Sequence, residues 1–294
     1  MKRYRIPSRL FTILVFLFLY APIVLLIVFS FNSGRSTRVW EGGFSLQWYA
    51  EFFQNARILE ALQNTLILSA LAAVIATVLG TAAAIGFSSM KKRTRTACLS
   101  ISNIPITNAD IITGVSMMLL FVFAINAFNG SFLSELFGIK WKMGFGTLLI
   151  AHITFDIPYV ILSVMPKLSQ LDANVYEAAR DLGATTFYAF RRVILPEIMP
   201  GVFNGLIIAF TMSLEDFVIS YFTKGSGVTT LAVEIYTMVK KPVTPEINAL
   251  STLLFLCVFL LLLIVNIRQA RQENLQLKRR AKLSPAQDGA SFQG

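Results

Sequence analysis

Six long apolar stretches constrain the fold of this chain more than any other feature of its 294 residues. Each stretch reaches the roughly 18 to 20 residues that a helix needs to cross about 30 Å of hydrocarbon. Because lipid cannot satisfy backbone hydrogen bonds, stretches of this kind cross the membrane as helices. The sequence therefore predicts an all-α, polytopic membrane protein with six transmembrane helices. The predicted spans are residues 10–31, 62–88, 98–125, 144–167, 198–222 and 248–267.

Basic residues set the predicted orientation of these spans. The net charge is +10, which could also indicate a nucleic-acid partner. However, eighteen of the 26 lysines and arginines fall on one side of a six-span topology. The positive-inside rule places that side, with both termini, in the cytoplasm. We therefore expect a multi-pass protein of a bacterial cytoplasmic membrane, with the lipid bilayer and not nucleic acid as its surroundings. Residues 1–267 form the predicted permease domain, and residues 268–294 form a cytoplasmic tail.

One cytoplasmic segment, residues 168–197, combines charge with helical periodicity. Asp172 is placed to cap a helix that Gly183 ends, and Thr185 or Thr186 can cap a second helix that ends before Pro196. Such a hairpin invites a docking partner. The alternative is an amphipathic segment that lies on the lipid headgroups.

The stretch EAARDLGATTFYAFRRVILP within this hairpin resembles the signature of ABC importer permeases. Val193 stands where isoleucine is usual. The resemblance implies a type I importer permease fold in which the hairpin couples to a separate ATPase. The chain contains no G-x-x-x-x-G-K-[ST] phosphate loop, so ATP and Mg²⁺ would be bound by that partner. We expect no catalytic residue, no enzyme activity and no cofactor or metal in this chain. The implied ATPase-coupling residues are Glu177, Ala178, Ala179, Gly183, Leu195 and Pro196.

Four acids inside the predicted spans indicate the charge of the cargo. Each ionisable group near the bilayer centre costs roughly 2.5 to 3.5 kcal/mol on insertion scales, so such groups should face a pathway. No Lys or Arg lies in the interior of a span, so the pathway is acidic and suits a cation. Aromatic rings could add cation–π contacts to alkyl ammonium groups. The acids are Asp110, Asp156, Glu215 and Asp216.

Helical spacing separates the adjacent pair Glu215 and Asp216 by about 100°. Asp216 therefore shares a polar face with Ser213 and Ser220, whereas Glu215 lies on a more apolar face. We expect Asp216 to face the pathway and Glu215 to pack against another span or lie near the outer interface. Phe217 and Tyr221 are the nearby aromatic residues.

The other two acids lie in the third and fourth predicted spans. Asp110 is expected near the middle of span three, beyond Pro105. Asp156 precedes Pro158, where a carboxylate could simply satisfy freed backbone N–H groups. For every acid the alternative is a structural cap or an interhelical hydrogen bond. The single histidine, His152, is expected to be packed and hydrogen-bonded and not to bind a metal.

Several further stretches resemble the PotC-like permeases of spermidine/putrescine importers. They are HITFDIPYV, VILPEIMPG, FTMSLEDFVISYF and EIYTMVKKPVTPEINALST. Pro242 stands where glycine is frequent, and Asp156 is not an acid that the resemblance carries over. The resemblance implies polyamine import by alternating access. It also implies a PotB-like second permease, two PotA-like ATPases and a PotD-like substrate-binding protein. Alternatives are an ABC permease for another cationic small molecule and an ATP-independent cation channel or carrier.

Overall fold

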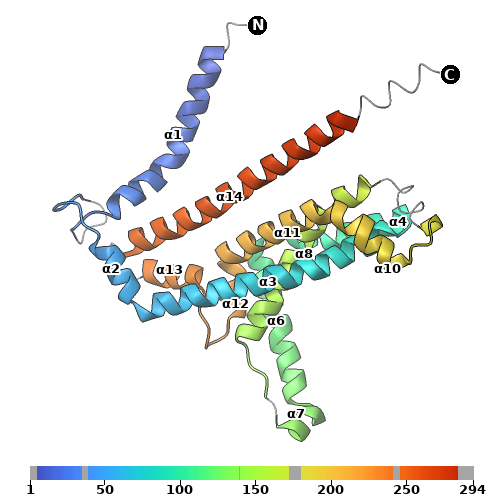
Figure 1. Ribbon diagram of the computed structural model, residues 1–294. Coiled ribbons are helices and arrows are strands. Elements are labelled where there is room, and N and C mark those ends of the chain that lie inside the picture. Colours follow the sequence, from blue (N-terminus) through green and yellow to red (C-terminus); the bar gives the residue numbers. More distant parts are fainter. Residues whose placement is uncertain (1–4, 35–38, 139, 172–179, 241–245, 284–294) are drawn as a thin grey trace. The chain divides into compact units, whose positions relative to one another are not determined.

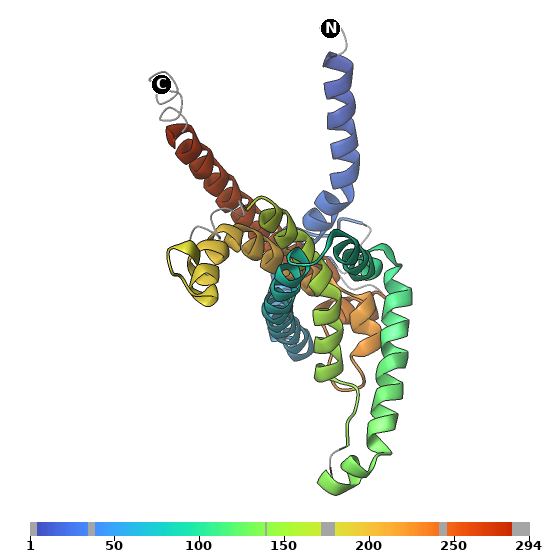
Figure 2. The ribbon, with the colours of Figure 1, turned by 90° about the vertical axis from the view of Figure 1, so that its right-hand side faces the viewer.

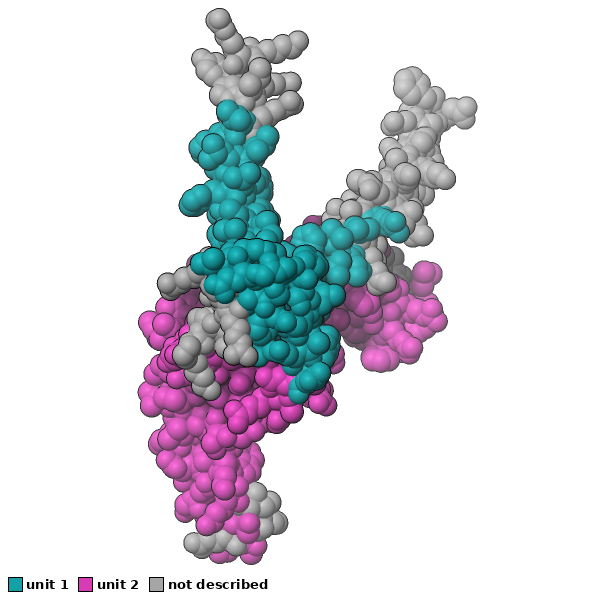
Figure 3. All heavy atoms as spheres, turned by 90° about the vertical axis from the view of Figure 1, so that its left-hand side faces the viewer, with its two compact units in different colours: residues 1–54, 243–294 teal, residues 55–242 magenta. Residues whose placement is uncertain are grey.

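The computed structural model describes residues 5–34, 39–138, 140–171, 180–240 and 246–283. These residues are mostly helical, and an isolated antiparallel bridge between Asn32 and Phe44 is the β pairing found among them. The chain divides into two compact units (Figure 3). Unit 1 contains residues 1–54 and 243–294, and unit 2 contains residues 55–242.

Within the described residues, six helices are long and apolar enough to cross a membrane. This number confirms the predicted six-helix, all-α class. The six segments are Leu10–Phe29, Ala56–Ser88, Asp110–Asn129, Phe145–Ser169, Thr186–Glu215 and Glu246–Ile264.

Unit 1 contains helices α1 (Arg5–Phe29), α2 (Gln47–Gln54) and α14 (Glu246–Leu283). Its connecting segment is held by side-chain bonds to the backbone. Trp48 Nε1 donates to the Asn32 carbonyl oxygen at 2.6 Å, and Asn32 Oδ1 accepts from the Glu41 N–H at 3.1 Å. Helix α2 packs against α14. Because α14 continues to Leu283, much of the predicted tail is helical.

The core of unit 2 consists of α3 (Ala56–Ser88), α8 (Phe145–Ser169) and α11 (Leu195–Glu215), which pack side by side (Figure 1). Small residues allow this close approach, as is usual between membrane helices. A Cβ atom added at Gly80 would lie 2.7 Å from Val160 Cβ. One added at Gly201 would lie 2.8 Å from the Ser163 carbonyl oxygen. The helices are therefore so close at these two positions that a residue larger than glycine would clash with the neighbouring helix.

The third predicted span, residues 98–125, is not one helix. The chain instead forms α4 (Lys92–Ser102), α5 (Ile104–Thr107) and α6 (Asp110–Asn129). Asn103 ends α4, and Pro105, which lacks an N–H, occupies the first turn of α5. Asn108 then takes an extended conformation before α6 begins. Helix α6 extends away from the core and is followed by α7 (Phe132–Phe137), as Figure 2 shows.

The sequence predicted that the helix before the fifth span ends ahead of Pro196. In the structure this helix continues past Pro196. Helix α10 (Thr186–Ala189) continues into a π-helical turn, η1 (Phe190–Ile194), and then into α11. Pro196 stands in the first turn of α11. A proline ring normally clashes with the carbonyl group four residues earlier, and the wider π turn relieves this clash. The result is a helical segment of 30 residues, Thr186–Glu215.

The predicted fifth span, residues 198–222, is interrupted near its other end. Helix α11 stops at Glu215, and α12 (Val218–Thr223) starts after Asp216 and Phe217. A further helix, α13 (Leu231–Val239), follows after a short connection. The interruption at Asp216 determines the geometry of the candidate site.

Candidate site at the break between two helices

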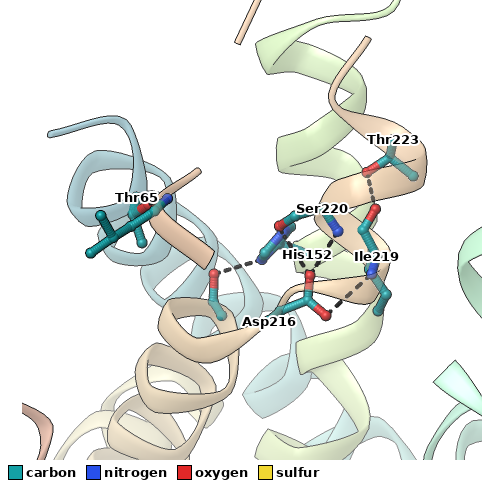
Figure 4. Close-up of polar contacts among 8 residues, drawn as sticks. Thr65, His152, Asp216, Ile219, Ser220 and Thr223 are labelled. Atoms are coloured by element: carbon teal, nitrogen blue, oxygen red, sulfur yellow. Dashed lines mark hydrogen bonds and ion pairs between the residues drawn. The ribbon is translucent and has the colours of Figure 1, made fainter. Parts of the chain in front are cut away.

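Asp216 lies at the break between α11 and α12 with an extended backbone, φ −64° and ψ 123°. Its Oδ2 accepts a hydrogen bond from the Ser220 N–H at 2.7 Å, and its Oδ1 accepts one from the Ile219 N–H at 3.3 Å (Figure 4). These N–H groups belong to the first turn of α12, where no intrahelical acceptor exists. The carboxylate therefore caps α12, and its side chain remains 10% exposed.

His152 joins this carboxylate to two helices. It lies on α8 and is 2% exposed. Its Nδ1 is 2.7 Å from Ser213 Oγ on α11, and its Nε2 is 3.0 Å from Ser220 Oγ on α12. Nε2 is also 3.6 Å from Asp216 Oδ2. Since a serine hydroxyl can donate or accept, the buried ring is satisfied in either tautomer. The predicted packed, hydrogen-bonded state of His152 is thus confirmed.

The polar residues predicted around Asp216 lie near it, but not for the predicted reason. Ser213 and Ser220 cannot share one face of a helix with Asp216, because the helix breaks between them. They meet instead through His152, which belongs to a different span. Sequence reasoning missed this link, although a histidine and two serines in apolar spans were available as a signal. Glu215 is exposed at the end of α11 and makes none of these contacts.

An aromatic cluster begins at Phe217, the residue that follows Asp216 in the chain. The Phe217 and Tyr221 ring centroids lie 5.6 Å apart. A third ring, Tyr236 of α13, lies 4.5 Å from Phe217 and 5.8 Å from Tyr221. Tyr236 was not predicted, because nothing in local periodicity brings α13 back to α12. Helix α13 is held on α3 by the Leu231 N–H, which donates to Thr65 Oγ1 at 2.7 Å.

Asp110 is not near the middle of a span. It is the first residue of α6 and is exposed, because the breaks at Asn103 and Asn108 shift the start of that helix. Helix α6 packs against α12, where a Cβ added at Gly114 would lie 3.4 Å from the Val218 carbonyl oxygen. Helix α6 therefore packs beside the break between α11 and α12. Asp110, at the start of α6, makes no hydrogen bond or ion pair with the His152 network among the described residues.

Asp156 is completely buried on α8, one helical turn from His152. Neither of its carboxylate oxygens has a hydrogen-bond partner among the residues that the structure describes. The alternative that it satisfies N–H groups freed by Pro158 is therefore not what the structure shows. No cluster of three or more metal-ligating side chains occurs in the described ranges.

The predicted coupling hairpin is described only in part. Glu177, Ala178 and Ala179 lie outside the described residues. Gly183 has a φ of +88°, a left-handed conformation that favours glycine. Thr185 Oγ1 caps α10 by accepting from the Tyr188 N–H at 3.3 Å, which agrees with the predicted cap. Leu195 and Pro196 are the first two residues of α11. The sequence signature therefore ends inside the helical segment Thr186–Glu215, which the hairpin is expected to move.

Comparison with solved structures identifies the fold. The fold matches a bacterial ABC transporter involved in the import of the acidic polysaccharide alginate, with a TM-score of 0.70 and 18% identity over 92% of this chain and 96% of that one. It also matches an amino acid ABC transporter with a TM-score of 0.53. The architecture is therefore that of an ABC importer permease.

The sequence comparison gives the family. Residues 76–275 match the model described as binding-protein-dependent transport system inner membrane component, and the chain belongs to this family of multi-pass transport permeases. It is 37% identical to the putrescine transport system permease protein PotI of Escherichia coli K12, over 93% of this chain and 95% of that protein. It is 36% identical to the spermidine/putrescine transport system permease protein PotC of the same strain, over 82% and 85%. The predicted resemblance is thus confirmed, and the family is one of transport subunits, not enzymes.

Proposed function

We propose that this chain is one permease subunit of an ATP-driven importer that carries polyamines, putrescine or spermidine, into the cytoplasm. The names of both relatives include putrescine. The structural matches support the ABC importer fold alone, since their identity is only 18%.

The observation that carries the cargo proposal is the juxtaposition of Asp216 with the aromatic cluster. A carboxylate whose acceptor capacity exceeds its two hydrogen bonds can attract an ammonium group. The rings of Phe217 and Tyr221 offer cation–π contacts and apolar surface for the methylene chain. Both features lie at one break between helices, where side chains can change surroundings when the helices move.

The exposed surface of the coupling hairpin supports a partner ATPase. Leu182 is 90% exposed, Phe187 72% and Tyr188 57%. Leu182 and Tyr188 also line a pocket of about 510 Å³. Apolar side chains at this exposure favour burial against another protein. We place this hairpin and both termini in the cytoplasm of a bacterial cell, on the basis of the charge distribution. The assembly would include a PotB-like permease, two PotA-like ATPases that bind ATP and Mg²⁺, and a PotD-like binding protein.

In the proposed cycle, the loaded binding protein docks outside and ATP closes the ATPase dimer. Movement of the hairpin is transmitted through the continuous segment Thr186–Glu215 to the break at Asp216. A cation held by one carboxylate and aromatic rings is bound only moderately, so it can leave when the cavity opens inward. Binding with equal strength in both states would not drive transport.

Charge removal at the two predicted acids tests the cargo site. The complete transporter would be reconstituted in proteoliposomes and its uptake of labelled putrescine and spermidine measured. Asp216→Asn and Asp110→Asn should each lower uptake several-fold, while assembly and basal ATPase activity persist. Because Asn retains an acceptor oxygen, Asp216→Asn can keep the α12 cap. Unchanged uptake in both variants would reject the acidic pathway, and uptake of a different cation alone would reassign the cargo.

A pulldown with the ATPase subunit tests the hairpin. Leu182→Asp should weaken capture of the ATPase, because it places a charge on an apolar contact surface. Leu136→Asp on α7 is the matched control, since Leu136 is also exposed, at 62%. Equal capture by both variants would favour the headgroup-bound alternative for this hairpin. Uptake without any ATPase subunit would favour a channel or carrier instead.

A further inference from the structure

Lys240 directly follows α13 and covers part of the aromatic cluster. Its Nζ lies 4.5 Å from the centroid of the Tyr236 ring, within the range of a cation–π contact. The pKa of the Lys240 ammonium is raised above its usual value, mainly through hydrogen bonding to Tyr236. The group that occupies this ring is therefore a full cation at neutral pH.

The covered ring belongs to the same cluster that adjoins Asp216. Tyr236 contacts both Phe217 and Tyr221, with centroid distances of 4.5 and 5.8 Å. The Lys240 side chain is a primary ammonium on a four-carbon stem, which is also the chemistry of one end of a linear diamine. The chain thus presents its own alkyl ammonium to the rings beside the candidate carboxylate.

We propose that Lys240 is a tethered stand-in for the transported cation, which takes over the Tyr236 ring face when it arrives. This inference rests on the proposed function, because it assigns a subsite to the same cargo. Exchange of one primary ammonium for another on the same ring changes few interactions. The subsite can therefore fill and empty without holding the cargo tightly.

The tether also sets a threshold for occupancy. A group linked by a short flexible chain competes at an effective concentration of the order of millimolar. Free cation at lower concentration would leave Lys240 in place. Cargo released by a docked binding protein is presented at a high local concentration and can displace it. Lys240 would thereby favour delivered cargo over stray cations.

The contact joins residues i and i+4, a spacing at which helix geometry alone brings side chains together. The experiment must therefore separate a competing cation from a surface contact. In the reconstituted transporter, Lys240→Met should lower the KM for putrescine about two- to fivefold, the effect of one partly exposed cation–π contact, with kcat unchanged. Lys240→Arg should keep the wild-type KM. Lys142→Met is the control, because Lys142 is exposed and has no ring contact among the described residues.

A double variant distinguishes competition from independent effects. Tyr236→Leu should raise the KM about two- to fivefold, and Lys240→Met should have no further effect in that background. A KM for Lys240→Met equal to that of the Lys142 control, or additive effects in the double variant, would overturn the inference.

A binding measurement keeps this test separate from transport. The lysines of the purified complex would be reductively ¹³C-methylated, which preserves their charge, and the Lys240 methyl signal assigned by its loss in Lys240→Met. A signal above a ring face is shifted upfield, and putrescine should return it towards the position seen in Tyr236→Leu. If putrescine displaces the signal but is not transported, the proposed function fails while the subsite stands. A signal that is unshifted, or that putrescine leaves unchanged, overturns the inference.

Discussion

Two acids within predicted spans, Asp216 and Asp156, have opposite surroundings. Asp216 accepts two backbone hydrogen bonds and lies 3.6 Å from a histidine nitrogen. Asp156 is fully buried, and its oxygens have no hydrogen-bond partner in the described part of the chain. Both residues belong to unit 2 but differ in what stabilises them.

The difference follows from the backbone around each acid. Helix α12 starts just after Asp216, so its first N–H groups are free to bind the carboxylate. Asp156 lies within α8, where backbone N–H groups are already bonded inside the helix. One turn further on, Val160 packs closely against Gly80 of α3 and Gly205 of α11. A helix break can therefore satisfy an acid that an intact, closely packed helix cannot.

The close packing around α8 is most easily disrupted at Gly80 of α3. Gly80→Leu should destabilise unit 2 by about 3 kcal/mol or more, because the added Cβ would lie 2.7 Å from Val160 Cβ. Thermal unfolding of the purified protein in detergent would measure the loss. Gly86→Leu is the matched control on the same helix, since a Cβ there meets nothing within 4 Å. Equal stability of the two variants would contradict the proposed close contact between α3 and α8.

The hydrogen bonds that cap α12 are removed by substituting Asp216 itself. Asp216→Ala should cost about 1–2 kcal/mol, because the first turn of α12 loses its acceptors. Asp216→Asn retains one acceptor oxygen and should cost less. The melting temperatures of both variants would be compared under the same detergent conditions. If Ala and Asn prove equally stable, the carboxylate does not act as a cap.

The fold class was accessible from sequence because hydropathy acts over whole helices. Six apolar stretches predict six spans whatever their neighbours are, and the described residues contain six such helices. The composition of the candidate site was also accessible. Polar residues are costly in apolar spans, so Ser213, Ser220 and Asp216 stand out without any structure.

The geometry was less accessible, because it depends on local breaks and on contacts between distant segments. One-helix periodicity assigned Glu215 and Asp216 to faces of a continuous helix, whereas the chain changes direction at Asp216. Pro196 was expected to end a helix, and a π turn accommodates it instead. His152 and Tyr236 reach the site from other helices, through contacts that no local pattern encodes.

A smaller effect is expected at Ser213, which links His152 to α11. Ser213→Ala should cost about 1 kcal/mol, since the His152 Nδ1 loses a buried partner at 2.7 Å. Ser163→Ala is the control, because among the described residues the Ser163 hydroxyl bonds only within its own helix, where it donates to the Tyr159 carbonyl oxygen at 2.9 Å. In thermal unfolding, the melting temperature of Ser213→Ala should be lower than that of Ser163→Ala. The reverse order would show that the His152 network does not stabilise the break.

The smallest effect on stability is expected at Asp156. Asp156→Asn removes no hydrogen bond seen among the described residues, so it should lower the free energy of unfolding by less than Asp216→Ala does. Thermal unfolding at neutral pH, beside Asp216→Ala, would measure the contrast between the two acids. A loss at Asp156 as large as that at Asp216 would contradict this contrast and show that the Asp156 carboxyl group stabilises the folded protein. Unchanged stability with reduced uptake would instead indicate that Asp156 acts during transport. Because Asp156 is fully buried, its charge could then meet the cargo only in a state in which α3, α8 and α11 separate.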